Sequence, residues 1–513
     1  MHRKWWTLSA VCAGVFMLLL DITIVNVALP DIERGFHASL SDLQWVIDAY
    51  ALTLAAFLLT AGSLADLLGR RRVFAAGIVL FTLGSLACGV ATGPLFLILA
   101  RAAQGVGGAI MFATSLALLA QAFRGRDRAI AFGLFGAITG VAVAVGPVLG
   151  GALTSGLSWR WIFFVNLPIG VAALAVTLLR VEESRDPNAR RPDWIGFLTF
   201  SSGLAALVFG LIRSNPDGWG STTVLVSLTA AGLLLVSFLV VERLQEAPML
   251  DLRLLRVPTF NGGLAAAFAI SASLFSLLTY IVLYMQNVLG LSALETGVRF
   301  LPLTGAIFLT AGIAGRLTAH VPRRLLIAPG FLLIGAGLLL MRGLTTSSTW
   351  THLLAGMIVS GVGAGLVNVP LVSTAVGVVE PARAGMASGI NSTLRQVGIA
   401  TGVAGLGTIF ASHIRSSVIS SLANTPLAAH AHAIAHSIST GGANHAIATT
   451  PAPLRGVVAG AAQSALVGSL NTILLAGAVV AFVAAASSFL LVRERDFVTT
   501  EEEAEPEPLA AAA

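Results

Sequence analysis

Long apolar stretches recur along the whole chain, and they constrain its fold more than any other feature. Charged residues make up 11% of the sequence and hydrophobic residues 56%, whereas a soluble domain carries about 25% charged residues. A helix of about 20 apolar residues matches the hydrocarbon core of a bilayer, and helices satisfy their own backbone groups in lipid. Fourteen such runs are predicted spans, at 6–29, 43–63, 73–92, 95–119, 129–153, 161–179, 194–213, 222–242, 260–286, 297–317, 325–342, 351–371, 387–410 and 469–492.

Basic residues gather in alternate connections between these runs. By the positive-inside rule, the basic connections face the cytoplasm, so both termini are expected there. All eight Trp residues lie at predicted span ends, as is typical of residues at the membrane interface. Because the basic residues are spread one loop at a time, they indicate topology rather than a nucleic-acid surface. The predicted inside set is Arg3, Lys4, Arg70–Arg72, Arg124, Arg126, Arg128, Arg180, Arg185, Arg190, Arg191, Arg243, Arg253, Arg256, Arg316, Arg323, Arg324, Arg383, Arg493 and Arg495.

One cytoplasmic loop occurs twice. Residues 61–77 (AGSLADLLGRRRVFAAG) align without a gap on residues 314–330 (AGRLTAHVPRRLLIAPG). An internal repeat of this kind is typical of two-halved transporters. The predicted organisation is a first six-span half, linkers with an inserted span pair, a second six-span half that includes an outside loop, and an acidic cytoplasmic tail. These parts are 1–180, 181–258, 259–492 (outside loop 412–468) and 493–513.

The first copy of the loop has the composition of a gate. Gly62 permits close helix approach and Gly69 a tight turn. Asp66 can pair with Arg70 or Arg71, or cap a neighbouring helix, and so stabilise a closed cytoplasmic side. The alternative is that the arginines only determine topology. The second copy has Ala319 in place of the acid, so the predicted latch is one-sided.

Small residues form a stripe along the predicted fifth span. Steps of three and four residues place one set on a single helical face, where another helix can pack closely; the set is Gly133, Gly136, Gly140, Ala144, Pro147 and Gly151. Pro147 removes a helical hydrogen bond and favours a bend. Ordinary small-residue packing is the alternative. The candidate positions are Gly136, Gly140, Gly146, Pro147, Gly150 and Gly151.

Few ionisable residues lie inside the spans, and each is a functional candidate because a charge in lipid is costly. Asp21, Asp48 and Arg101 fall at similar depth in spans 1, 2 and 4. An acid that exchanges an arginine partner for water can bind and release a proton; a static buried ion pair is the alternative. In the second half, Arg395 and Gln396 are cavity candidates that attract an anion, orient substrate or serve packing alone.

The sequence gives little support for a nucleotide-binding, hydrolytic, disulfide or metal site. There is no GxxxxGK[ST], HExxH or GxSxG motif, which argues against an ATP-driven pump and against these hydrolases. Cys12 and Cys88 lie inside spans, so no disulfide is expected. The histidines of the outside loop have no Cys or carboxylate beside them, and no metal site is expected. The proton gradient is the expected driving force, with no cofactor.

Four motifs together resemble the major facilitator superfamily, specifically its fourteen-span drug:proton antiporters. They are LDITIVNVALP (20–30), GSLADLLGRRR (62–72), RAAQGVGG (101–108) and GVAVAVGPVLGG (140–151). The resemblance implies that Asp66 and Arg70 belong to the gating loop, Arg101 to the proton relay, Asp21 to the span-1 acid, and Gly146 and Pro147 to the antiporter bend.

The expected protein is therefore an all-α integral membrane protein with a major-facilitator fold. It is predicted to be a monomeric, multi-pass protein of the cell membrane that exchanges protons for a small lipophilic drug or antibiotic. Some relatives carry another acid in a later span to recognise dications. This sequence has none, so a monocationic or neutral substrate is expected. The alternatives are export of one endogenous metabolite or self-made antibiotic, and a non-transporting receptor or scaffold.

Overall fold

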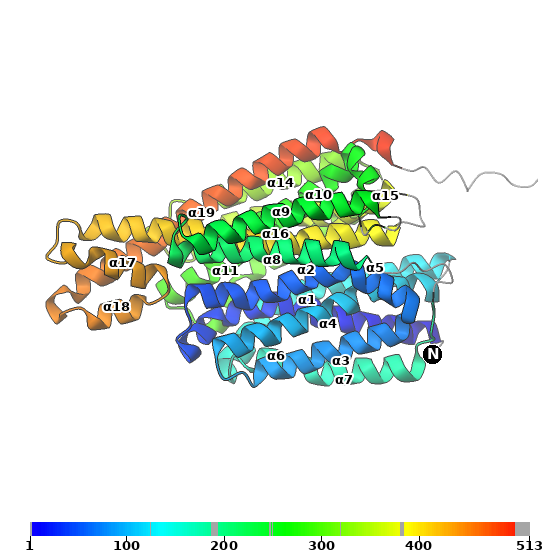
Figure 1. Cartoon of the computed structure of the whole chain (residues 1–513), viewed down its shortest axis with the longest axis horizontal. Coiled ribbons are helices and arrows are strands. Elements are labelled where there is room, and N and C mark those ends of the chain that lie inside the picture. Colours follow the sequence, from blue (N-terminus) through cyan, green and yellow to red (C-terminus); the bar gives the residue numbers. More distant parts are fainter. Residues whose placement is uncertain are drawn as a thin grey trace, which may run out of the picture.

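The computed structural model describes residues 3–123, 125–185, 193–245, 248, 250–318, 320–379 and 384–497, and the regular elements in these ranges are helices. Their long axes run roughly together along the molecule (Figure 1). The α-helices are α1 (Arg3–Phe36), α2 (Leu40–Leu68), α3 (Arg70–Gly89), α4 (Pro94–Ala122), α5 (Gly125–Gly156), α6 (Trp161–Phe164), α7 (Asn166–Arg180), α8 (Trp194–Asp217), α9 (Thr222–Leu244), α10 (Pro258–Ile270), α11 (Ser276–Leu283), α12 (Ala293–Arg299), α13 (Leu301–Leu317), α14 (Arg324–Leu340), α15 (Thr351–Gly377), α16 (Ala384–Leu422), α17 (Ala431–Ser439), α18 (Ala443–Thr449) and α19 (Arg455–Leu491).

Helix lengths agree with a many-span membrane protein. Among the described residues, eleven helical segments are long and apolar enough to cross a bilayer, and the count rises to thirteen when the bent helices α2 and α5 are included. α14 coincides with the remaining predicted span but has 17 residues, fewer than the roughly 20 that match the hydrocarbon core. The all-helical class is confirmed, while the number fourteen stays a prediction.

The two predicted halves lie on opposite sides of the bundle. Helices α1–α7 form the lower side in Figure 1, and α10, α14, α15, α16 and α19 form the upper side. We call the end with the Gly62–Arg72 loop the inner end, because it is predicted to be cytoplasmic, and the opposite end the outer end.

The inserted pair α8–α9 lies beside the seam between the halves. Side chains of α8 share a buried apolar cluster with α2 of the first half and α16 of the second half, including Leu204, Ala55 and Ala404. Phe197 of α8 packs edge-on against Phe57 of α2, with ring centroids 4.7 Å apart. The Thr408 hydroxyl on α16 donates to the Leu211 carbonyl of α8 at 3.0 Å. The pair therefore contacts both halves.

The predicted outside loop 412–468 is largely helical. α16 and α19 extend into it, and η5 (Ala428–His430), α17, α18 and η6 (Ala452–Leu454) lie between them. These short helices form a separate lobe at the outer end of the molecule (Figure 1). α17 buries Ala431, Ala435 and Ile438. Apolar positions spaced three and four residues apart thus fold this Ala- and Ser-rich segment into a cap.

One span is interrupted by two π-helical turns. The segment from α10 to α11 contains η2 (Ser271–Phe275), and η3 (Tyr284–Val288) follows α11. Such turns widen the helix locally and often occur at functional sites. Nothing in the apolar pattern of residues 260–286 distinguishes these turns from ordinary helix, so the sequence did not predict them.

Candidate functional site

A charged cluster lies between α1 and α4 inside the first half. Arg101 donates through Nη1 to an oxygen of Asp21 and, at 2.8 Å, to the side-chain oxygen of Gln104. Gln104 in turn donates to the other Asp21 oxygen at 2.8 Å. The exposed fractions of Asp21, Arg101 and Gln104 are 0%, 2% and 0%. The predicted pair Asp21 and Arg101 is thus brought together, with both carboxylate oxygens hydrogen-bonded.

Helix α2 positions the guanidinium of this cluster. The Arg101 Nε donates to the Val46 carbonyl at 3.1 Å, and the guanidinium carbon lies 4.2 Å from the centre of the Tyr50 ring. A cation over an aromatic face is favourable, most of all away from water. Gln104 and Tyr50 were not predicted, although Gln104 lies three residues after Arg101, on the same helical face.

Asp48 does not join this cluster. It is fully buried, yet neither of its carboxylate oxygens has a hydrogen-bond partner in the structure. One turn earlier on α2, the Gln44 amide donates to the Tyr280 hydroxyl at 3.2 Å and to the Val403 carbonyl at 3.3 Å, both in the second half. Residues four apart share a helical face, so Asp48 lies on the face of α2 that meets the second half. The prediction that it groups with Asp21 and Arg101 is not reflected in this geometry.

The Gly62–Arg72 loop is held by its own half. Arg70 forms an ion pair with Asp66, 2.8 Å apart, and its backbone N–H donates to the Ser184 carbonyl at 2.8 Å. The Arg71 backbone N–H donates to the Glu183 carboxylate at 3.0 Å. Glu183 follows α7, and its role was not predicted. In this state, the side chains and backbone groups that bind Asp66, Arg70 and Arg71 belong to the first half and to the segment that follows α7.

The two loop glycines have different surroundings. Gly69 has φ +112°, a value that favours glycine. A Cβ there would lie 2.7 Å from a Glu183 carboxylate oxygen. A Cβ at Gly62 would meet nothing within 4 Å. The turn therefore requires glycine at position 69, whereas the predicted close approach at Gly62 is not present in this state.

The second copy of the loop is anchored in a similar way. The Arg323 backbone N–H donates to the Glu494 carboxylate at 2.7 Å, and its guanidinium pairs with the same residue at 3.1 Å. Glu494 follows α19, the last helix of the second half, just as Glu183 follows the last helix of the first half. Ala319, the position that replaces Asp66, lies outside the described residues.

The small-residue stripe of α5 contacts both halves. Gly146 and Gly150 face Thr23 and Ile24 of α1, whereas a Cβ at Gly151 would lie 2.5 Å from the Ala293 carbonyl of α12. Gly140 faces Phe308 of α13, and Gly136 meets nothing within 4 Å and is exposed. α5 bends by 40° between Ala142 and Val145, close to Pro147. The glycines of the stripe thus face three different helices, α1, α12 and α13, rather than forming one continuous seam, and Gly136 faces none of them.

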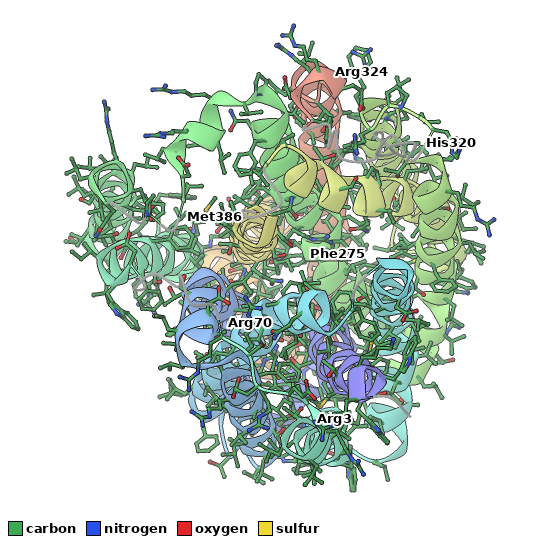
Figure 2. All side chains as sticks on the ribbon, turned by 90° about the vertical axis from the view of Figure 1, so that its right-hand side faces the viewer. Arg3, Arg70, Phe275, His320, Arg324 and Met386 are labelled. Carbon is green, nitrogen blue, oxygen red and sulfur yellow. The ribbon has the colours of Figure 1, made fainter. Side chains whose placement is uncertain are left out.

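Between the halves lies a small, mainly apolar cavity of about 30 Å³. The first half contributes α1 and Pro147, and the second half contributes η2, α11 and the start of α13. Seen from the inner end, Phe275 of η2 lies near the middle of the molecule, between Arg70 of the first half and Arg324 of the second (Figure 2). The polar residues that line this cavity are Thr23, Asn26 and Thr304, and none of them was predicted as a site residue.

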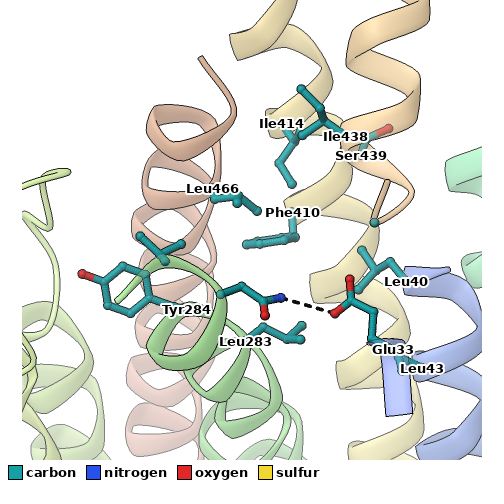
Figure 3. Close-up of a pocket in the computed structure, with 13 residues that line it drawn as sticks. Glu33, Leu40, Leu43, Leu283, Tyr284, Phe410, Ile414, Ile438, Ser439 and Leu466 are labelled. Carbon is teal, nitrogen blue, oxygen red and sulfur yellow. Dashed lines mark hydrogen bonds between the residues drawn. The ribbon is translucent and has the colours of Figure 1, made fainter. Parts of the chain in front are cut away.

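Hydrogen bonds join the halves at their outer parts. The Thr279 hydroxyl donates to the Asn26 side-chain oxygen at 3.0 Å, and Gln286 donates to the Val27 carbonyl at 2.8 Å. Further out, a cavity of about 60 Å³ is lined by both halves and by Ile438 and Ser439 of the cap. At its edge Asn287 donates to Glu33 at 3.3 Å (Figure 3). The structure is therefore closed on the outer side.

In the second half, Arg395 lies within α16. Its Nη2 donates to the Asn368 side-chain oxygen of α15 at 2.8 Å, and the residue is partly exposed. The neighbouring Gln396 oxygen is buried without a hydrogen-bond partner. Arg395 and Gln396 thus lie within the long helix α16 but do not line either cavity described above, and their role in a cavity stays a prediction.

Known proteins resemble this chain in sequence and fold. A family model described as the Major Facilitator Superfamily matches residues 11–403. Multidrug resistance protein Stp of Mycobacterium tuberculosis is 38% identical over 80% of this chain and 77% of its own length. Puromycin resistance protein pur8 of Streptomyces alboniger is also 38% identical, over 79% of this chain and 82% of its own length.

A third relative and a solved structure extend the comparison. The tetracenomycin C resistance and export protein of Streptomyces glaucescens is 34% identical over 80% of this chain and 77% of its own length. The crystal structure of a bacterial homologue of the human lysosomal transporter Spinster, inward-facing and occupied, has a TM-score of 0.63. It covers 96% of this chain and 98% of that one at 16% identity, so this likeness concerns the fold.

Proposed function

Because the chain belongs to the Major Facilitator Superfamily, we propose that it is a proton-coupled antiporter that exports lipophilic drugs or antibiotics by alternating access. It acts as a monomer in the cytoplasmic membrane, with both termini in the cytoplasm. Protons entering from outside drive the cycle, and no other cofactor is required. Alternating access requires a state in which the protein is closed on one side and has a cavity between its halves. The hydrogen bonds at the outer end and the cavity between the halves support this proposal, because they fit such a state.

The observation that carries the proposal is the buried cluster of Asp21, Arg101 and Gln104. A charge inside the membrane is costly and usually functional. Here the acid has two donors, one cationic and one neutral, so a change of helix packing can replace the cation by water. Proton binding at Asp21 then depends on the state of the protein. Asp48, buried on the opposing face of α2 without a hydrogen-bond partner, supplies a second place for a proton.

Two other functions share part of this support. A dedicated exporter of one endogenous metabolite or self-made antibiotic would have the same fold and proton site, and the names of two relatives include single antibiotics. Transport assays with a panel of unrelated compounds separate it from a broad exporter. A non-transporting receptor or scaffold would show no gradient-dependent flux at all.

The test uses the purified full-length protein in liposomes with an imposed pH gradient and Nile red, a neutral lipophilic dye, as the transported compound. The native protein should move the dye only while the gradient lasts. Asp21→Asn should abolish gradient-driven movement, because the amide cannot exchange a proton. Asp217→Asn is the matched control, since Asp217 forms an ion pair with Arg213 within α8. Unchanged gradient-driven flux in Asp21→Asn would refute the coupling role of Asp21.

A further inference from the structure

The second half contains a guanidinium deep in the membrane with little to neutralise it. Arg395 lies eleven residues from the inner end of α16 at Ala384, about 16 Å at 1.5 Å per residue. Its partner Asn368 lies nine residues from the inner end of α15 at Gly377, or about 14 Å. Both positions are near the middle of a hydrocarbon core of about 30 Å. A charge at this depth requires a partner or water.

The described residues supply one neutral partner for this charge. The guanidinium has five N–H donors, and the structure pairs one nitrogen with the Asn368 oxygen at 2.8 Å. The described carboxylates of the second half pair elsewhere: Glu295 with Ser292 and Arg299, Glu494 with Arg323, and Asp496 with Thr259 and Arg495. Glu380 lies outside the described residues. None of these carboxylates therefore pairs with Arg395, and its hydrogen bond to Asn368 uses only one of its five N–H groups.

A second donor stands beside the guanidinium. Asn391 precedes Arg395 by four residues, so the two share a face of α16. Asn391 is 3% exposed, and its side-chain nitrogen has no hydrogen-bond partner. Leaving a buried donor unpaired costs about 1–3 kcal/mol. Asn391 therefore has an unpaired donor beside a partly exposed guanidinium, and a ligand that carries oxygen acceptors can bind to both.

We propose that Arg395, Asn391 and Asn368 form a subsite for the acidic group of a lipophilic organic anion, such as a carboxylate or phenolate. A carboxylate matches a guanidinium in charge and in fork geometry. This inference rests on the proposed function, because it names the class of molecule exported. The expectation of a neutral substrate is retained. An organic anion replaces the monocation, because a guanidinium with no acidic partner among the described residues repels a cation.

The test measures binding rather than transport, so that its failure is separate from failure of the proton-coupled cycle. The probes are a fluorescent diethylaminocoumarin carboxylate and its neutral ethyl ester, titrated into the full-length protein in bilayers of phosphatidylcholine. This lipid has no net charge, so no anionic headgroup competes. The native protein should bind the acid roughly tenfold more tightly than the ester, equivalent to one charge-assisted contact.

Three variants define the subsite. Arg395→Gln should weaken binding of the acid roughly tenfold and leave the ester within about twofold, and Arg395→Lys should restore most of the preference. Asn368→Asp places a permanent carboxylate beside the guanidinium, so it should abolish the preference while keeping the fold intact. A merely structural role for Arg395 predicts normal binding in Asn368→Asp. Equal affinity of the native protein for acid and ester, or no binding of the acid, overturns the proposal.

Discussion

Each half of the molecule has an arginine in the interior of a long helix, but the two arginines have very different surroundings. Arg101 in the first half meets a carboxylate, a side-chain amide, a carbonyl and an aromatic ring. Arg395 in the second half meets the oxygen of Asn368 and is partly exposed. The first arginine is therefore balanced within the protein, whereas the second remains available to a ligand. The two halves thus share a repeated loop and a helical architecture, but they differ in the partners of their interior arginines.

The largest expected effect comes from breaking the balanced pair. Arg101→Gln leaves Asp21 buried without its cation, and removal of one partner of a buried ion pair costs about 3–5 kcal/mol. The free energy of unfolding, measured by titrating the purified protein with SDS, should fall by about that amount.

The matched control for this change is Arg395→Gln. Because no described carboxylate pairs with Arg395, its removal leaves no orphaned charge, and stability should change by less than about 1 kcal/mol. An equal loss of unfolding free energy in Arg101→Gln and Arg395→Gln would show that the two arginines contribute equally to stability, which would contradict the difference in their surroundings.

A double substitution measures the coupling within the first cluster. Asp21→Asn and Arg101→Gln together remove both charges, so the double variant should be more stable than the sum of the single effects predicts. Coupling between residues in direct contact is about 0.5–3 kcal/mol. The measurement is a double-mutant cycle on the same unfolding titration. Strict additivity would mean that the pair contributes no mutual stabilisation.

The smallest effect is expected at Asp48. Its carboxylate oxygens have no hydrogen-bond partner to lose, so Asp48→Asn should change the free energy of unfolding by less than about 1 kcal/mol. Asp21→Asn, which disturbs two hydrogen bonds, is the comparison in the same titration. A loss at Asp48 as large as that at Asp21 would indicate a partner that forms in another state.

Much of the architecture could be predicted because membrane spans are recognisable from their apolar composition. Runs of apolar residues lead directly to helices, and the repeated loop separates the halves. The contact of Asp21 with Arg101 was also predictable, since few charges lie inside the spans and opposite charges at equal depth attract. The grouping of Asp48 with them did not follow, because depth alone does not tell which helical face a residue occupies.

The remaining features depend on contacts between distant parts of the chain. Glu183 and Glu494 are ordinary surface acids in the sequence, and only folding brings them to the duplicated loop. The bonds from Gln44 to Tyr280 and Val403 join segments more than 200 residues apart. The π-helical turns η2 and η3 likewise leave no mark in hydropathy, since one extra residue per turn does not change composition.

The position of α8 makes the two lateral faces of the molecule unequal. On one face, α8 contacts both α2 and α16 and covers the line along which the halves meet. On the other, α5 meets α12 and α13 directly, at Gly151 and Gly140. A lipophilic molecule dissolved in the bilayer thus meets α8 before the line between the halves on the first face. On the second face it meets the contact of α5 with α12 and α13 itself, so the two sides of the protein present different surfaces to the membrane.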